Sequence, residues 1–148
     1  MALTQGQPLQ NGKYTIEREL GRGRVGITYL ARRIDGMRRV IKILNPDMLA
    51  TLSVAEQERL EMMFWQEAVK LAKCSGTAHI VQMDTPFKEG MVTCLPMEYM
   101  DGNSLADRGQ QKLPEKIALE YVRQIGEALA IVHQQNLVHC DIRPANIF

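Results

Sequence analysis

Residues 14–44 read YTIERELGRGRVGITYLARRIDGMRRVIKIL and contain three strand patterns separated by two turn signals. In the first pattern, YTIEREL, apolar side chains recur at even spacing, which is typical of a half-buried strand. The stretches ITYLARR and RRVIKIL are rich in β-branched and aliphatic residues and predict two further strands. A glycine-rich turn joins the first two strands, and Asp35-Gly36 is a hairpin signal before the third. Connections of this length predict an antiparallel sheet, because parallel strands need long crossovers.

The segment after this stretch predicts a helix and two more strands. Ser53 and Glu56 have the spacing of a capping box, and the helix that they open continues to about Cys74. Strand-like stretches follow at residues 79–83 and 91–99. Together with the first three strands, these stretches predict a sheet of five strands with one helix inserted after the third.

The last third of the chain is expected to be helical. Pro114 suits the first turn of a helix that ends near Asn136. Its apolar stripe comprises Ile117, Tyr121, Ile125, Leu129 and Val132. We expect this third to be weakly held, because the chain offers the stripe no partner surface. The predicted fold class is therefore α+β, an antiparallel five-stranded sheet with one helix, followed by helices.

The composition of the chain excludes several classes of protein. Its 148 residues are 45% apolar and 24% charged, as in a globular chain, and disorder, collagen and coiled coil are excluded. No run approaches the roughly 18 apolar residues of a membrane span, and the first residues lack a signal-peptide pattern. Three well-separated cysteines predict reduced thiols and a cytoplasmic protein. Residues 13–42 hold nine of the 18 basic residues and three of the 17 acidic ones, which suits phosphate, nucleic acid or a solvated strand surface.

The turn after the first strand carries glycines at positions 21, 23 and 26. Without Cβ atoms, such a turn brings backbone N–H groups close to phosphate oxygens. A dinucleotide-binding turn has the same spacing but opens a helix, whereas the strand-forming stretch ITYLA follows here. A plain glycine hairpin without a ligand is the remaining alternative.

Two charged residues lie where apolar ones are expected. Lys42 is inside an apolar strand, where an ammonium group is costly unless it is paired or bound to a ligand. It shares a strand face with Val40 and Leu44, so it reaches phosphate if that face looks toward the glycine turn. Glu67 lies near the buried side of the first predicted helix and needs a cation, for which Lys42 is the candidate. The alternatives are a lysine whose stem extends to water and a solvent-facing glutamate.

The final residues 138–148 read VHCDIRPANIF and combine three residue types that suit one reaction. A carboxylate such as that of Asp141 can accept a hydroxyl proton, and an amide oxygen such as that of Asn146 can ligate Mg²⁺. A cation such as that of Arg143 can neutralise a transferring phosphoryl group. The alternative is a loop of Asp and Asn residues that has no such task.

Together with the preceding motifs, this loop makes the chain from about Tyr14 to Phe148 resemble a protein kinase of the bacterial eukaryotic-like Ser/Thr type. The order of glycine turn, VIK lysine, helix glutamate, hinge and catalytic loop is that of the family. Residues 1–12 are polar and contain Gly6, Pro8 and Gly12, so they predict a flexible lead-in. The resemblance implies a small lobe with its hinge at 13–100. It further implies that residues 101–148 are an incomplete start of the large lobe, ending in the catalytic loop.

The resemblance implies a role for each matching position of the small lobe. Gly21, Gly23 and Gly26 would cover the nucleotide phosphates. Lys42 would hold the α- and β-phosphates and pair with Glu67. The gatekeeper and the hinge, whose backbone would receive adenine, are Met97, Glu98, Tyr99 and Met100.

The resemblance likewise implies the activity and its ligands. The chain would be part of a Ser/Thr protein kinase that uses ATP and Mg²⁺ and phosphorylates a Ser or Thr hydroxyl of a protein substrate. Asp141 matches the catalytic base, Arg143 would face the γ-phosphate, and Asn146 matches the Mg²⁺ ligand. Nucleotide phosphate then explains part of the basic segment, and no nucleic acid is needed.

The 148 residues contain no Asp-Phe-Gly triplet, the segment whose aspartate holds the principal Mg²⁺ in the family. We therefore expect a truncated kinase domain that turns over no ATP by itself. Two alternatives stay open. One is a natural short pseudokinase that acts as a binding or regulatory module, and the other is a split kinase that a second chain completes.

Overall fold

The computed structural model of the chain describes residues 2–148, which form two compact units. The first unit contains the described residues up to Ser75 together with Val81–Tyr99. The second unit contains Gly76–Ile80 and Met100–Phe148. The glycine turn, Lys42 and Glu67 therefore belong to the first unit, and the loop with Asp141 belongs to the second.

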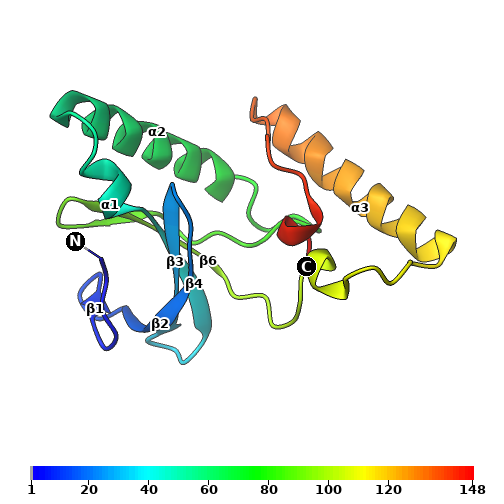
Figure 1. Cartoon of the computed structure of the whole chain (residues 1–148), viewed down its shortest axis with the longest axis horizontal. Helices are drawn as coiled ribbons and strands as arrows, with labels where there is room; N and C mark the ends of the chain where they lie inside the picture. The colour runs from blue at the N-terminus through cyan, green and yellow to red at the C-terminus, as the bar shows by residue number, and fades with distance from the viewer. Residues whose placement is uncertain (1) are drawn as a thin grey trace. The chain divides into compact units, whose positions relative to one another are not determined.

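The first unit is built on a six-stranded antiparallel sheet with the strand order β1-β2-β3-β4-β6-β5 (Figure 1). The α+β class and the antiparallel pairing predicted from the sequence are confirmed. The strands are β1 (Pro8–Leu9), β2 (Tyr14–Arg22), β3 (Gly26–Arg33), β4 (Arg38–Leu44), β5 (Phe87–Glu89) and β6 (Val92–Glu98).

The sheet has one strand more than predicted because the lead-in takes part in it. The sequence predicts loose structure over residues 1–12, whereas the short strand β1 pairs with the start of β2. Leu3 is 8% exposed and Leu9 is fully buried in the core. Burial of these two leucines stabilises the segment, although most of its residues are polar. Gly12 (φ +83°) adopts the left-handed conformation of the turn that leads into β2.

The strand predicted at residues 79–83 is wrong in position. In the structure this stretch makes a single bridge, from Met83 to Met97, and the partner strand β5 lies further along the chain. β5 and β6 form a tight hairpin in which Glu89 pairs with Val92 across two turn residues. Gly90 (φ +59°) occupies the left-handed region there, which favours a two-residue hairpin turn.

The main hydrophobic cluster of the first unit, its core, lies on one face of the sheet, where strand alternation places it, while Leu30, Leu44 and Leu95 are buried on the opposite face. In β4, Ile41 and Ile43 are 0% and 1% exposed, while Lys42 between them is exposed on the other face. The buried residues of the core are Leu3, Leu9, Tyr14, Ile16, Ile27, Tyr29, Ala31, Ile41, Ile43, Phe87 and Cys94.

Two helices follow β4 in the first unit. Asn45 caps the short helix α1 (Pro46–Leu49), and Ser53 caps α2 (Val54–Ala72). The predicted capping box is confirmed, since the Ser53 N–H donates to Glu56 Oε2 (2.8 Å) and the Glu56 N–H donates to Ser53 Oγ (3.4 Å). Ala68 is the buried residue of α2, so most of this helix is in contact with solvent.

The second unit contains the helix α3 (Glu115–Gln134) between two short 3₁₀ turns, η1 (Leu105–Arg108) and η2 (Pro144–Asn146). The N–H of Leu105 donates to the carbonyl of Ile147 (2.8 Å) and joins the segments of the two turns. The predicted apolar stripe of α3 is covered to different extents: Val132 is 6% exposed, whereas Ile117 is 43% exposed. No helix within residues 2–148 has the length and apolar character needed to cross a membrane.

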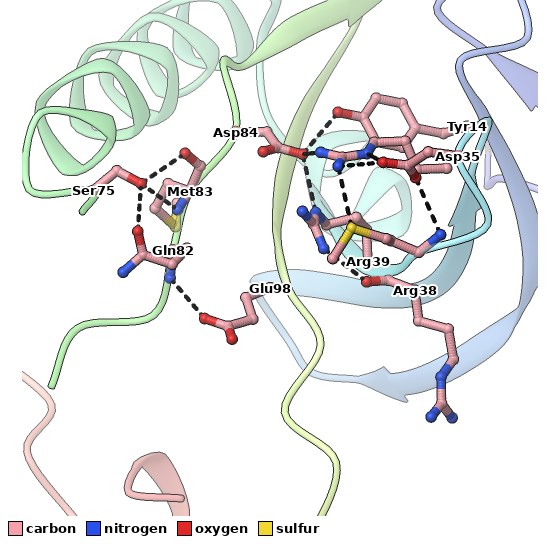
Figure 2. A network of polar contacts seen from close by, with 11 residues as sticks. Tyr14, Asp35, Arg38, Arg39, Ser75, Gln82, Met83, Asp84 and Glu98 are labelled. Atoms are coloured by element: carbon pink, nitrogen blue, oxygen red, sulfur yellow. Dashed lines mark hydrogen bonds and ion pairs between the residues drawn. The ribbon is translucent and has the colours of Figure 1, made fainter. Parts of the chain in front are cut away.

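A polar network around Asp84 joins the ends of β2, β3 and β4 in the first unit (Figure 2). The carboxylate of Asp84 accepts hydrogen bonds from the phenol of Tyr14 (3.0 Å) and from the guanidinium groups of Arg39 (3.1 Å) and Arg33 (3.4 Å). The Tyr14 ring stacks on Phe87 with centroids 5.6 Å apart. Burial, followed by the charge of Asp84, raises the pKa of the Tyr14 phenol above its ordinary value of about 10.

The raised pKa of Tyr14 predicts a loss of stability in alkali. Above pH 10 the unfolded chain releases the phenol proton while the folded chain keeps it, so the free energy of unfolding falls as the pH rises. Relative to Tyr14→Phe, the wild type should lose up to about 1.4 kcal/mol per pH unit between about pH 10 and 11.5. Urea denaturation of both proteins measures this difference, and equal pH slopes would contradict the prediction.

Candidate functional site

The glycine-rich turn connects β2 and β3 and has an ordered hydrogen-bond pattern. The N–H of Gly23 donates to the carbonyl of Gly26 (2.9 Å), which closes the turn. A Cβ atom at Gly26 would lie only 3.1 Å from the carbonyl oxygen of Ile43. The backbones of β3 and β4 therefore approach closely at the third glycine, and a larger residue there would make a tight contact with the Ile43 carbonyl.

Lys42 lies next to this turn. A Cβ atom at Gly26 would lie 3.4 Å from Cε of Lys42, so the end of the lysine stem passes beside the third glycine. In the sheet register Lys42 pairs with Thr28 of β3 and Leu95 of β6, and these partners share its face. The turn and the ammonium group thus lie together on the face opposite the core, and this arrangement fits the phosphates of a nucleotide.

Glu67 lies on α2 and is exposed, as is Lys42. Although both residues lie in the described range 2–148, no ion pair within 4.0 Å joins them. The sequence places a glutamate on the helix, but the position of that helix against the sheet decides whether the two charges meet. The structure therefore does not bring this predicted pair together.

The predicted gatekeeper and hinge lie at the end of β6. Met97 pairs with Val40 of β4 and forms the bridge to Met83. The Glu98 N–H donates to the carbonyl of Gln82 (2.8 Å), and the Gln82 N–H donates back to Glu98 Oε2 (3.2 Å). Figure 2 shows how Ser75 supports the same stretch, with Oγ 3.1 Å from the N–H and the carbonyl of Met83. The sequence does not reveal this support, because no local pattern relates Ser75 to Met83 or Gln82 to Glu98.

The two remaining hinge residues lie just beyond β6. The guanidinium of Arg38 lies 4.8 Å from the centre of the Tyr99 ring, a cation–π contact that fixes the ring. Met100 is 36% exposed and is the first residue of the second unit's main segment. The unit boundary therefore falls inside the predicted hinge.

The second unit brings Asp141, Arg143 and Asn146 together. Asp141 Oδ1 pairs with Nε of Arg143 (3.1 Å), and Asp141 Oδ2 accepts from Nδ2 of Asn146 (2.9 Å). Nδ2 of Asn146 also donates to the carbonyl of Asp141 (2.9 Å), and the Asp141 N–H donates to Nδ1 of His139 (3.2 Å). These bonds orient the carboxylate, which stays exposed, and each of its oxygens retains a lone pair for a hydroxyl proton.

The same loop offers limited metal ligation. Asn146 donates through its nitrogen, so its amide oxygen is the atom able to ligate a cation. Within residues 2–148 there is no cluster of three His, Cys, Asp or Glu side chains that could hold a metal ion. The loop therefore suits Mg²⁺ only where phosphate and water oxygens supply the other ligands, as Mg²⁺ often requires.

One residue near the turn was not identified from the sequence. Asn45 is 7% exposed, and its side chain donates to the carbonyl of Gly23 (2.9 Å). The Asn45-Pro46 pair predicts only the end of a strand. The available signal was an asparagine before a proline, since Asn is a preferred N-cap and Pro a preferred first helical residue.

An antiparallel sheet with a glycine-rich turn beside a lysine, followed by a loop with Asp141, Arg143 and Asn146, defines the kinase class of folds. The chain belongs to the protein kinase family, since the protein kinase domain matches residues 14–148. The family predicted from the sequence is confirmed.

The similar proteins include bacterial Ser/Thr kinases. The chain is 32% identical over 140 residues to the serine/threonine-protein kinase pkn2 of Myxococcus xanthus, covering 93% of this chain and 16% of that protein. It is 29% identical over 149 residues to PknA of Corynebacterium glutamicum, covering 95% and 30%. The crystal structure of the PknI kinase domain of Mycobacterium tuberculosis superposes with a TM-score of 0.73 at 28% identity, covering 99% and 57%. The chain therefore spans only part of each of these relatives.

Proposed function

We propose that the chain is the nucleotide-binding and catalytic-loop part of a Ser/Thr protein kinase. The observation that carries the proposal is the arrangement of Asp141, whose carboxylate is held by Arg143 and Asn146 in a chain of this family. The catalytic loop of a kinase needs such an oriented carboxylate to accept the hydroxyl proton of its substrate.

ATP bound here would supply the γ-phosphoryl group. Gly21, Gly23 and Gly26 would cover its phosphates, and Lys42, whose stem passes beside Gly26, would neutralise part of their charge. Backbone groups of residues 97–100 would receive adenine, since the contacts to Gln82 and Arg38 hold this segment in place.

In the proposed reaction, Asp141 takes the proton of a Ser or Thr hydroxyl of a protein substrate. Arg143 lies against Asp141 and would neutralise the charge of the transferring phosphoryl group. Asn146 would contribute one oxygen ligand to Mg²⁺. Glu67 would pair with Lys42 only after a rearrangement, because no ion pair joins the two in this structure. We place the protein in the cytoplasm, because its three cysteines are free thiols.

A binding or regulatory module without turnover is the second candidate. The absence of an ion pair between Lys42 and Glu67, both of which the structure describes, favours it, since an active kinase requires that pair. The half-covered stripe of α3 suits a split kinase in which a second chain packs against Ile117 and its neighbours.

The purified 148-residue chain is expected to bind MgATP without turning it over. Asp141 and Asn146 offer too few oxygen ligands to hold the metal and the phosphates in line by themselves. Isothermal titration measures MgATP binding, and a coupled ADP assay with a protein acceptor measures turnover. Failure to bind MgATP would contradict the proposed function. Turnover that Asp141→Ala abolishes would contradict the expectation of an inactive chain.

A further inference from the structure

Asn45 contacts the glycine-rich turn through two separate groups. It is the first residue after β4, and its backbone N–H donates to the carbonyl of Val25 (2.8 Å). Its side-chain Nδ2 donates to the carbonyl of Gly23 (2.9 Å). Both carbonyls belong to the tip of the turn between β2 and β3.

A third contact of Asn45 fixes its side chain. Oδ1 accepts from the N–H of Asp47 (3.0 Å), so the same amide group caps α1 and holds the turn. Asn45 is 7% exposed, and its side-chain rotamer is fixed because the nitrogen and the oxygen of its amide group each make a hydrogen bond. The nearby pair of Arg22 and Asp47 (3.4 Å) adds little, because the Asp47 side chain is 82% exposed.

These contacts set the direction of the backbone N–H groups in the turn. All peptide bonds of the described chain are trans, so a carbonyl and the N–H of the next residue point in opposite directions. The carbonyl of Gly23 points at Asn45, so the N–H of Arg24 points away from it. The carbonyl of Val25 likewise points at Asn45, so the N–H of Gly26 points away. Among residues 2–148, the N–H of Arg24 has no hydrogen-bond partner and is available to an anion.

We propose that Asn45 is a positioning residue for nucleotide binding, which orients the N–H groups of the glycine-rich turn toward the phosphates. The proposal rests on the proposed function. A phosphate attracts N–H groups and is repelled by carbonyl oxygens, so a turn free to rotate its peptide planes would bind phosphate less tightly. Asn45 removes that freedom without touching the nucleotide.

The test compares a ligand that has phosphates with one that lacks them. Asn45→Ser keeps an N-cap oxygen for α1, because Ser and Asn are about equally good caps, but loses the donor to Gly23. MgATP should bind about threefold to tenfold more weakly, while adenosine should bind within about twofold of the wild type. Ser53→Ala removes the other helix cap of this unit, whose side chain bonds to Glu56 and not to the turn, and should change neither affinity.

Two titration outcomes would overturn the proposal. They are an unchanged MgATP affinity in Asn45→Ser, and an equal loss for MgATP and adenosine, which indicates general damage. A wild-type chain that binds neither ligand would contradict the proposed function instead. Amide hydrogen exchange then still tests the positioning role of Asn45. Faster exchange of the Gly23 N–H in Asn45→Ser than in the wild type supports the proposal that Asn45 holds the turn in place. Unchanged exchange overturns that proposal.

Discussion

Replacing Lys42 by methionine is expected to weaken MgATP binding by about tenfold to a hundredfold, the size of a lost charge-assisted hydrogen bond. Methionine keeps the length of the apolar stem that passes beside Gly26 but lacks the ammonium group. Because Lys42 is exposed and lies opposite the core, the free energy of unfolding should change by less than about 0.5 kcal/mol. The effect should therefore appear in binding and not in stability.

Lys88 provides the matched control for this substitution. It is an exposed lysine in the short strand β5, which lies at the far edge of the sheet from β3. Lys88→Met removes the same charge from the same unit and should leave the MgATP affinity within about twofold. Isothermal titration measures the MgATP affinity of the wild type and both variants. An equal loss of MgATP affinity in the two variants would show that Lys42 acts only through the net charge of the unit. An unchanged affinity in Lys42→Met would exclude Lys42 from the nucleotide site.

The parts of the fold that were predictable are those where a local pattern and burial agree. The strands from Tyr14 to Leu44 show alternating burial over part of their length, as in residues 14–16 of β2 and 41–43 of β4, and the capping box at Ser53 needs only residues three apart. The strand β5 was missed because three residues are too few to show a period. Its first residue, Phe87, stacks on Tyr14, which lies far earlier in the chain. Such long-range packing cannot be predicted from a short stretch of sequence.

The same distinction applies to the candidate site. Asp141, Arg143 and Asn146 lie within six residues, so their spacing alone predicts that they meet, and the structure joins them. Lys42 and Glu67 are 25 positions apart on a strand and a helix, and whether they pair depends on how α2 packs. Asn45 was missed because its contact with Gly23 crosses from the end of β4 to the turn before β3. The residue type of Asn45 predicts its role as a helix cap, but only the structure shows its contacts with the glycine-rich turn.

Ile41→Ala is expected to give the largest loss of stability, about 2–5 kcal/mol, because it removes a fully buried side chain from the middle of the sheet. β4 lies between β3 and β6, and Ile41 pairs there with Tyr29 and Pro96. These strands are held by their backbone ladder, so they have little freedom to close the cavity. Urea denaturation measures the loss, which is a large share of the total stability of a unit of this size.

The control for Ile41 is Ile34, which is the same residue type in the turn after β3 and is 82% exposed. Ile34→Ala should change the free energy of unfolding by less than about 0.5 kcal/mol. Ile41 and Lys42 are neighbours on opposite faces of one strand, so their variants should affect stability and MgATP affinity separately. Under conditions where it is folded, Ile41→Ala should keep its MgATP affinity within about twofold, whereas Lys42→Met should keep its stability and lose affinity. A parallel loss of affinity in folded Ile41→Ala would show that the core and the nucleotide face are not independent.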